Sequence, residues 1–471
     1  MGKENETIAS EVALGFLPVR KGERSFRFID LLLIQTGIGI SCFGLLVGVY
    51  TGLMLNAKEA IAAILFGNAI PVLLIMPIAI LFSRYGVDTF VGFRSALGYR
   101  GAQILFVLFL LMNFGFLCVG CFMAGETATS LISLFSNNEF FTGRTTGAPL
   151  FGIIIFLLGA FVAFKGPKAI KWFNWIGIPA FLVLLVCLIV ALLFGQGLDK
   201  IFGLQPIAPL DSHALSFATA VEINVGLGFS WLIYIGQYSR MAKTEKSAFT
   251  SGFWSYGVLV NVAAILGAFG ALVSKSAIPS DIMSIFNPTF EVIGLLLLIA
   301  GNLAAIIFLF YSQGVSVKTA FPKLRWGLAI ASALPTIVLI VSPVFYDSYS
   351  IFIAIVSYTM AVLGGVVIVD FFFVKKQKIS VRDLYDHYGA YTYWKGVNPS
   401  AIVSFIAGTI TYWQLYNPLT GETSVLFTYV TAGLFTYFVS GICYYICSTF
   451  IFNYEKNILT NYVRKEKERV V

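Results

Sequence analysis

Hydrophobic runs of roughly 20 residues recur from end to end of this 471-residue chain, and each is long enough to cross a bilayer core about 30 Å thick as an α-helix. Only 11% of the residues are charged, and 58% are hydrophobic. A typical soluble domain has about a quarter of its residues charged. The sequence therefore predicts an all-α polytopic membrane protein with about twelve transmembrane helices.

Basic residues are concentrated in alternate loops between these runs. The net charge is +8, but the positive residues form no basic domain of the kind that binds nucleic acid. If an even number of spans places both ends inside, only four Lys or Arg residues lie outside, namely Lys58, Arg144, Lys200 and Lys275. This asymmetry predicts cytoplasmic termini. We expect a multi-pass protein of the plasma membrane that contacts the lipid bilayer, binds no nucleic acid and functions as a monomer.

The spans divide into two halves of five and a final pair. An odd number of spans in each half gives the halves opposite topology, as inverted repeats require. No repeat is visible at the level of residues, so the symmetry rests on topology alone. The expected segments are a cytoplasmic tail (1–28), helices 1 to 5 (29–195), helices 6 to 10 (196–374), a cytoplasmic loop (375–397), helices 11 and 12 (398–452) and a cytoplasmic C-terminal tail (453–471).

Residue types that support enzymatic or metal chemistry are sparse. All six cysteines fall within apolar segments, where they act as small packing residues. His213 and His387 lie in loop-like contexts, and no nucleophile constellation is visible. We therefore expect a protein that is not an enzyme and that needs no cofactor other than a coupling ion, H⁺ or Na⁺.

The stretch Gly226–Arg240, GLGFSWLIYIGQYSR, combines paired glycines and aromatic residues with a polar end. It predicts a membrane helix that is interrupted to hold a ligand. Glu222 lies in the same apolar run, and a carboxylate is tolerated there only if it faces protein or a water-filled cavity. Glu222 is the first candidate for a proton-coupling group. Glu126 is the second, with a satisfied or interfacial carboxylate as its alternative.

Two other spans carry candidate ligand groups. Asn113, Phe116 and Gly120 are spaced so that they share one face of a helix over about 102–135. An amide and a ring on one face can grip a flat heterocycle. Glycines in the first span, including Gly37, expose backbone at membrane depth or, alternatively, permit close helix packing.

Several motifs, taken in order along the chain, resemble the nucleobase-cation symporter family that includes cytosine, purine-cytosine, hydantoin and allantoin permeases. The strongest is QYSRM at Gln237–Met241, similar to the family's Asp-Tyr-Ser-Arg-Tyr element. Ser230, Trp231 and Tyr234 upstream of it are similar to the purine-cytosine branch. Further marks are SRYG and GFRSALGYRG after the second span, GNLAA at 301–305, GGVVIVDFFFVKK at the end of the tenth span, and GVNPSA before the eleventh.

The resemblance implies a LeuT-type fold of ten helices in two inverted repeats, plus two C-terminal helices, with the substrate held between helices 1, 3, 6 and 8. Phe116 then stands where relatives stack a tryptophan on the substrate, and Gln237 stands where they carry an aspartate. The substrate-binding positions that follow are Ser41, Asn113, Phe116, Gly120, Gly228, Phe229, Ser230, Trp231, Gln237 and Asn302.

The resemblance also implies a cation site between the first and eighth spans. Sodium-coupled relatives place hydroxyl side chains in the eighth span, whereas this chain has Ala304 and Ala305. The backbone carbonyls of Gly37 and Ile40 then remain as the main ligands for sodium. Coupling to sodium through these carbonyls and coupling to protons through Glu222 or Glu126 both stay open.

Together these features predict a secondary active symporter that imports a nucleobase such as cytosine or a purine, or a related heterocycle, by alternating access. The alternatives are a LeuT-type symporter of another small solute, such as an amino acid, allantoin, hydantoin or thiamine, and a membrane receptor that binds its ligand without moving it.

Overall fold

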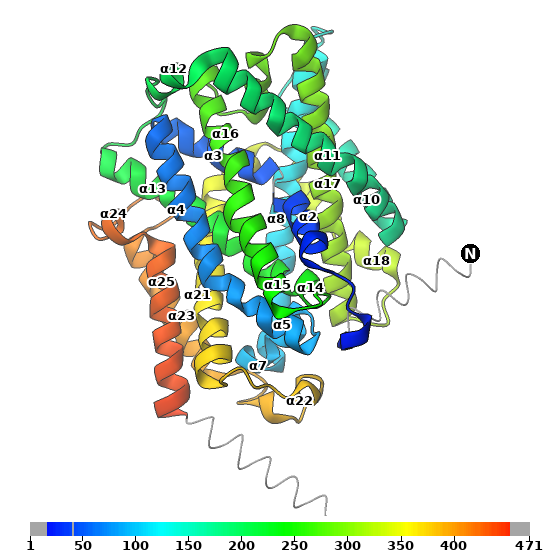
Figure 1. Ribbon diagram of the computed structural model, residues 1–471, viewed down its shortest axis with the longest axis vertical. Coiled ribbons are helices and arrows are strands. Elements are labelled where there is room, and N and C mark those ends of the chain that lie inside the picture. The colour runs from blue at the N-terminus through cyan, green and yellow to red at the C-terminus, as the bar shows by residue number, and fades with distance from the viewer. Residues whose placement is uncertain (1–16, 40–41, 453–471) are drawn as a thin grey trace, which may run out of the picture.

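Helices make up the regular structure of the described chain. The computed structural model describes residues 17–39 and 42–452, and within these ranges the only β-structure is three isolated bridges. Among the described residues, nine helices are long and apolar enough to cross a membrane. Shorter apolar helices lie beside them (Figure 1). The prediction of an all-α polytopic membrane protein is confirmed, while the count of twelve spans stays a prediction.

The principal helices follow the predicted order. In the first half they are α2 Phe28–Gly39, α3 Cys42–Met54, α4 Ala57–Ile75, α5 Ala79–Tyr85, α8 Tyr99–Ser133, α10 Gly147–Phe164 and α11 Pro167–Val190. In the second half they are α13 His213–Ser230, α14 Ile235–Ser239, α15 Glu245–Gly252, α16 Val260–Ser274, α17 Pro288–Ala320, α18 Trp326–Ala331, α19 Thr336–Ile340 and α21 Tyr349–Val369. The C-terminal pair is α23 Pro399–Leu415 and α25 Ala432–Ile446.

Short polar residues fix where several helices begin. The Asn287 side chain accepts a hydrogen bond from the backbone N–H of Phe290 at 3.1 Å, and Pro288 follows as the first residue of α17. Asn398 caps α23 in the same way, ahead of Pro399. Proline suits this position because it has no N–H to leave unsatisfied there.

Helices from the two halves pack in reciprocal pairs. Helix α3 of the first span packs on α16 of the seventh, and α4 of the second packs on α13 of the sixth. In the predicted repeats, the first span corresponds to the sixth and the second span to the seventh. Exchanging these counterparts turns the pair of spans 1 and 7 into the pair of spans 6 and 2, as two interlocked inverted repeats require. Helices α8 and α17, the third and eighth spans, pack directly on each other. Helices α23 and α25 pack against α21 at one side of the bundle (Figure 1).

The interruption predicted within Gly226–Arg240 is a 3-10 turn that follows the paired glycines and does not include them. Helix α13 continues through Gly226 and Gly228 to Ser230, and a 3-10 turn, η4 (Trp231–Tyr234), follows. A Cβ at Gly228 would lie 2.8 Å from the backbone oxygen of Asn68, and one at Gly226 would lie 3.1 Å from Ile353. The glycines therefore let α13 approach α4 and α21 closely, and the helix tightens one turn after them.

The fifth span ends later than predicted. The expected boundary between the halves, 195–196, falls inside a π-helical stretch, Ala191–Gly197, which continues α11 before the short α12 (Leu198–Phe202). The predicted boundary after residue 374 coincides with the end of the π-helical stretch Asp370–Val374. Of the predicted tails, residues 1–16 and 453–471 lie outside the described residues.

Candidate functional site

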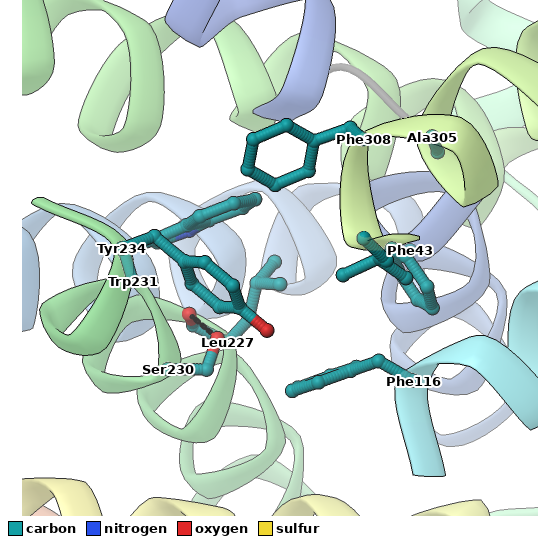
Figure 2. Close-up of a pocket in the computed structure, with 9 residues that line it drawn as sticks. Phe43, Phe116, Leu227, Ser230, Trp231, Tyr234, Ala305 and Phe308 are labelled. Atoms are coloured by element: carbon teal, nitrogen blue, oxygen red, sulfur yellow. Dashed lines mark hydrogen bonds between the residues drawn. The ribbon is translucent and has the colours of Figure 1, made fainter. Parts of the chain in front are cut away.

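Four spans enclose a small cavity beside the 3-10 turn η4 (Figure 2). Its volume is about 30 Å³, far below the roughly 300 Å³ at which small-molecule pockets usually begin. A heterocycle therefore needs a movement of the helices to enter. The described residues that line it are Phe43 from α3, Phe116 from α8, Leu227, Ser230, Trp231 and Tyr234 from the sixth span, and Ala305, Phe308 and Leu309 from α17.

Aromatic rings form most of the cavity wall. Phe43 and Phe116 meet edge to face with their centroids 5.4 Å apart. The Trp231 and Tyr256 rings stack with their centroids 4.4 Å apart and an interplanar angle of 11°. One face of the indole therefore packs on the π-helical stretch Phe253–Leu259 that precedes α16. Rings that are fixed in this way provide flat apolar surfaces on which a planar ligand can stack.

A directional chain of hydrogen bonds leads away from the cavity. The Tyr234 hydroxyl points across the gap toward α8 (Figure 2) and donates to the Asn113 side-chain oxygen at 3.2 Å. The Asn113 amide nitrogen donates to Gln313 at 2.7 Å, and Gln313 donates to Ser332 at 2.8 Å. Because the Tyr234 proton is engaged, its oxygen offers lone pairs to anything else that reaches it.

Two polar groups near the cavity lack partners. Asn302 is fully buried, and neither of its amide atoms has a hydrogen-bond partner in the part of the chain that the structure describes. It lies one turn before Ala305 on the same face of α17. The Trp231 indole nitrogen is also buried and unpaired among these residues. Such groups cost about 1–3 kcal/mol each when left unsatisfied, so their presence indicates a ligand or water that pairs with them.

The structure brings several predicted substrate residues together. Phe116, Ser230 and Trp231 line the cavity, and Asn113 contacts it through Tyr234. Gly120 borders it, since a Cβ there would lie 3.5 Å from the Phe43 ring.

Other predicted substrate residues lie elsewhere. Phe229 points to the opposite side of α13 and stacks on Tyr437 of α25 at 5.6 Å, and Gly228 packs against α4. Gln237 joins the sixth span to α17, because it accepts from Ser312 at 2.8 Å and donates to Ser316 at 3.2 Å. Ser41 and Ile40 lie outside the described residues.

Sequence reasoning missed five lining residues, Phe43, Leu227, Tyr234, Phe308 and Leu309. A signal existed for two of them. Phe308 and Leu309 follow Ala305 by three and four positions, which is the spacing of one helix face.

A second, smaller cavity lies where the cation site was predicted. Thr36, Gly37, Gly301 and Ala304 line it together with residues of α11, and its volume is about 10 Å³. The Thr36 hydroxyl is buried and has no hydrogen-bond partner among the described residues. Ala305, predicted to belong to this site, lines the aromatic cavity instead.

Glu222 lies away from both cavities, against the C-terminal helices. One carboxylate oxygen accepts hydrogen bonds from Tyr412 at 3.0 Å and Ser357 at 3.2 Å, and the Gly433 backbone N–H approaches both oxygens at 3.1 and 3.0 Å. No Lys or Arg of the described chain pairs with it. Glu222 is therefore a buried carboxylate held by neutral donors.

Glu126, by contrast, is paired with a cation. Arg144 contacts Glu126 at 2.5 Å and Asp347 at 2.5 Å. Hydrogen bonding to Asp347 raises the pKa of Arg144, although burial opposes the rise. The three residues tie the end of α8 to the short helix α20 (Val344–Asp347) that precedes α21.

Comparison with known proteins decides which family this arrangement represents. Residues 18–447 match the family described as "Permease for cytosine/purines, uracil, thiamine, allantoin". The chain belongs to this family. It is therefore a membrane permease and not an enzyme, and the predicted family is confirmed.

Curated relatives of this permease are distant but match over most of their length. It is 23% identical to a hydantoin permease of Microbacterium maritypicum over 82% of this chain and 81% of the relative. It is 26% identical to an allantoin permease of Bacillus subtilis over 70% of this chain and 71% of the relative. It is 23% identical to a purine-uracil permease of Arabidopsis thaliana over 83% of this chain and 69% of the relative.

Solved structures establish the fold of the permease. The nucleobase-cation-symport-1 transporter Mhp1, in a closed conformation with bromovinylhydantoin bound, matches with a TM-score of 0.73 at 19% identity, covering 94% of this chain and 98% of that one. MhsT in complex with L-phenylalanine matches with a TM-score of 0.52 at 14% identity, covering 88% of this chain and 96% of that one. The predicted LeuT-type fold is confirmed by these likenesses.

Proposed function

We propose that this permease imports a neutral, flat, nitrogen-rich heterocycle, such as a nucleobase or a hydantoin-like ring, together with a cation. The observation that carries the proposal is the aromatic cavity with the unpaired Asn302 amide one turn away. The names of the relatives, which include hydantoin, allantoin and purine-uracil permeases, agree with this class of substrate.

Polar groups around the cavity define the edge that the heterocycle presents. Tyr234 donates its proton to Asn113, so its oxygen is placed to accept a hydrogen bond from a substrate N–H. Asn302 provides one donor and one acceptor, which match an N–H and a C=O that lie side by side. Cytosine, uracil, hypoxanthine, hydantoin and allantoin all carry such an edge.

The lining favours a neutral substrate over an amino acid. None of the described residues that line the cavity is charged, and a buried charge without a partner is strongly unfavourable. A zwitterionic amino acid would bring two such charges. Membership of a permease family also argues against a receptor that binds without transport.

Two sites support alternative cations. The cavity beside Thr36 and Gly37 is about the size of one water or ion and contains an unpaired hydroxyl, which supports sodium. Buried Glu222, which has no cationic partner in the described chain, supports a proton. Imposing a sodium gradient and a pH gradient separately across proteoliposomes distinguishes the two ions.

Substrate uptake tests the proposed function directly. The purified permease, reconstituted into proteoliposomes, is tested with labelled cytosine, adenine, hypoxanthine, uracil, allantoin and hydantoin, and with phenylalanine as a zwitterionic comparison. At least one heterocycle should accumulate under an ion gradient. Background uptake of every heterocycle by folded protein would refute the proposal.

We further propose that the permease lies in the plasma membrane as a monomer with both termini in the cytoplasm and has no nucleic-acid partner. The distribution of basic residues supports this orientation, since Arg24, Arg84 and Lys243 gather at one end of the bundle.

A further inference from the structure

A third cavity, lined mainly by charged residues, lies at the end of the bundle that we assign to the cytoplasm. It has a volume of about 370 Å³. Four of its lining residues are basic and one is acidic: Lys21, Arg24, Arg84, Lys243, Thr244 and Glu245. They come from the segment ahead of α2, the end of α5 and the start of α15, so three separate parts of the chain build the cavity.

Backbone hydrogen bonds hold the segment ahead of α2 in place across the inner ends of the helices. The Val19 N–H donates to the Gly86 carbonyl at 2.8 Å. Phe26 pairs with the strand-like link after α14, donating to Met241 at 3.1 Å and accepting from Lys243 at 2.9 Å. The segment ahead of α2 therefore forms an ordered wall of the cavity, although most of this segment is not helical.

Positive charge in this cavity exceeds the negative charge available to match it. Arg84 and Glu245 form a bidentate pair at 2.8 Å for each contact, so their charges offset each other. Lys21, Arg24 and Lys243 form no ion pair within the described chain. Three positively charged side chains therefore line one cavity without an ion-pair partner in the described chain.

The Arg24 guanidinium is fixed against the end of α5. Its two terminal nitrogens donate to the backbone oxygens of Ser83 and Arg84. Its Nε is buried and has no partner among the described residues. Burial lowers the pKa of Arg24, and the charge of Glu245 opposes that change. An anion in the cavity would offset the cost of burying this charge.

We propose that this cavity binds a phosphate-type oxyanion. Arginine and lysine donors that converge on one point match the several acceptor oxygens of such a group. The anion is inorganic phosphate or the phosphodiester of an anionic lipid headgroup, since both carry the same chemistry and a basic cavity beside the cytoplasmic leaflet meets both. The proposal does not depend on which heterocycle the permease transports.

Thermal unfolding of the full-length permease in detergent tests the proposal. Adding potassium phosphate should raise the apparent Tm in a saturable way, beyond the effect of potassium chloride at equal ionic strength. The double variant Lys21→Gln and Lys243→Gln should weaken the apparent phosphate affinity about tenfold or more, because two charge-assisted contacts are lost. These lysine side chains make no hydrogen bond within the described chain, so the variant should fold.

A lysine outside the cavity provides the matched control. Lys323, an exposed residue in the loop after α17, is changed to Gln and should leave the phosphate response unchanged. The proposal is overturned if chloride reproduces the shift, or if the double variant responds like the parent protein.

Lipid nanodiscs then identify the source of the anion. If phosphatidylglycerol raises the Tm of the parent protein above its value in phosphatidylcholine, and added phosphate has no further effect, the ligand is a headgroup. If phosphate acts equally in both lipids and phosphatidylglycerol alone does not, the ligand is the free ion. Equal responses of parent and double variant to both ligands would overturn the proposal, whatever the uptake assays show.

Discussion

At the scale of the residue, we expect the Asn302 side chain to lower the stability of the substrate-free protein while it contributes to substrate binding. Its amide is fully buried and unpaired within the described chain, which costs about 1–3 kcal/mol in the absence of a ligand. Asn302→Leu keeps the branching and the number of side-chain heavy atoms and removes the unpaired groups. We expect the apparent Tm to stay the same or rise, while heterocycle uptake falls about tenfold or more because a substrate edge loses its partner.

Asn224 provides the matched control for that variant. It is equally buried, but its amide donates to Thr51 and to the Ala220 carbonyl, both at 2.9 Å. Asn224→Leu should therefore lower the Tm because two buried hydrogen bonds are lost. If Asn302→Leu lowers the Tm as much as Asn224→Leu does and leaves uptake intact, Asn302 has a structural role and does not bind substrate.

Glu222 is the residue whose proposed role depends on protonation. Glu222→Gln keeps a side chain of the same size but cannot gain or lose a proton. If the proton is the coupling ion, uptake by the variant should become independent of pH and no longer respond to a pH gradient. Uptake assays between pH 5.5 and 8.0 measure this, with Glu59→Gln as a partly exposed comparison. An unchanged pH profile would exclude Glu222 as the coupling site.

At the scale of the element, glycines set how closely the helices of the two halves approach. A Cβ at Gly48 of α3 would lie 1.9 Å from the Ala264 carbonyl of α16. Gly48→Val should therefore force the two helices apart and destabilise the bundle by about 1–3 kcal/mol or more. The measurement is the apparent Tm together with the yield of monodisperse protein.

Gly195 provides the comparison for that substitution. Nothing lies within 4 Å of the position that its Cβ would occupy, so Gly195→Ala should leave the Tm nearly unchanged. A similar loss of stability at both positions would show that glycine flexibility, and not the close approach of α3 and α16, governs the effect.

At the scale of the whole molecule, the aromatic cavity is too small to hold a heterocycle. Its volume of about 30 Å³ requires the bundle to move before a heterocycle can bind, as alternating access demands. Links at each end would have to break or shift during that movement. Arg144 joins Glu126 and Asp347 at one end, and Arg84 joins Glu245 at the other.

The orientation of the whole molecule is testable by labelling. Single cysteines at Lys275 and Lys323, placed in a background without the six native cysteines, should react with a membrane-impermeant maleimide from opposite sides. We expect Lys275→Cys to label in intact cells and Lys323→Cys only after the membrane is opened. The reverse pattern would invert the topology proposed from the distribution of basic residues.

The sequence by itself determined the membrane class, the order of the spans and the family. Long apolar runs in a bilayer have to satisfy their backbone hydrogen bonds internally, so helices are their only solution short of a closed barrel. Family motifs such as QYSRM occur at fixed places in the chain and do not depend on contacts. Of the substrate-binding residues predicted from the sequence, Phe116, Ser230 and Trp231 line one cavity in the structure.

Only the tertiary structure decided which neighbour each of these residues meets. Paired glycines look alike in sequence whether they unwind a helix or admit another one, and the nearness of Asn68 to Gly228 shows close packing here. Phe229 and Trp231 are two positions apart, yet one meets Tyr437 and the other the cavity. Helical periodicity separates the faces of a helix, but the partner on each face comes from residues distant in the chain.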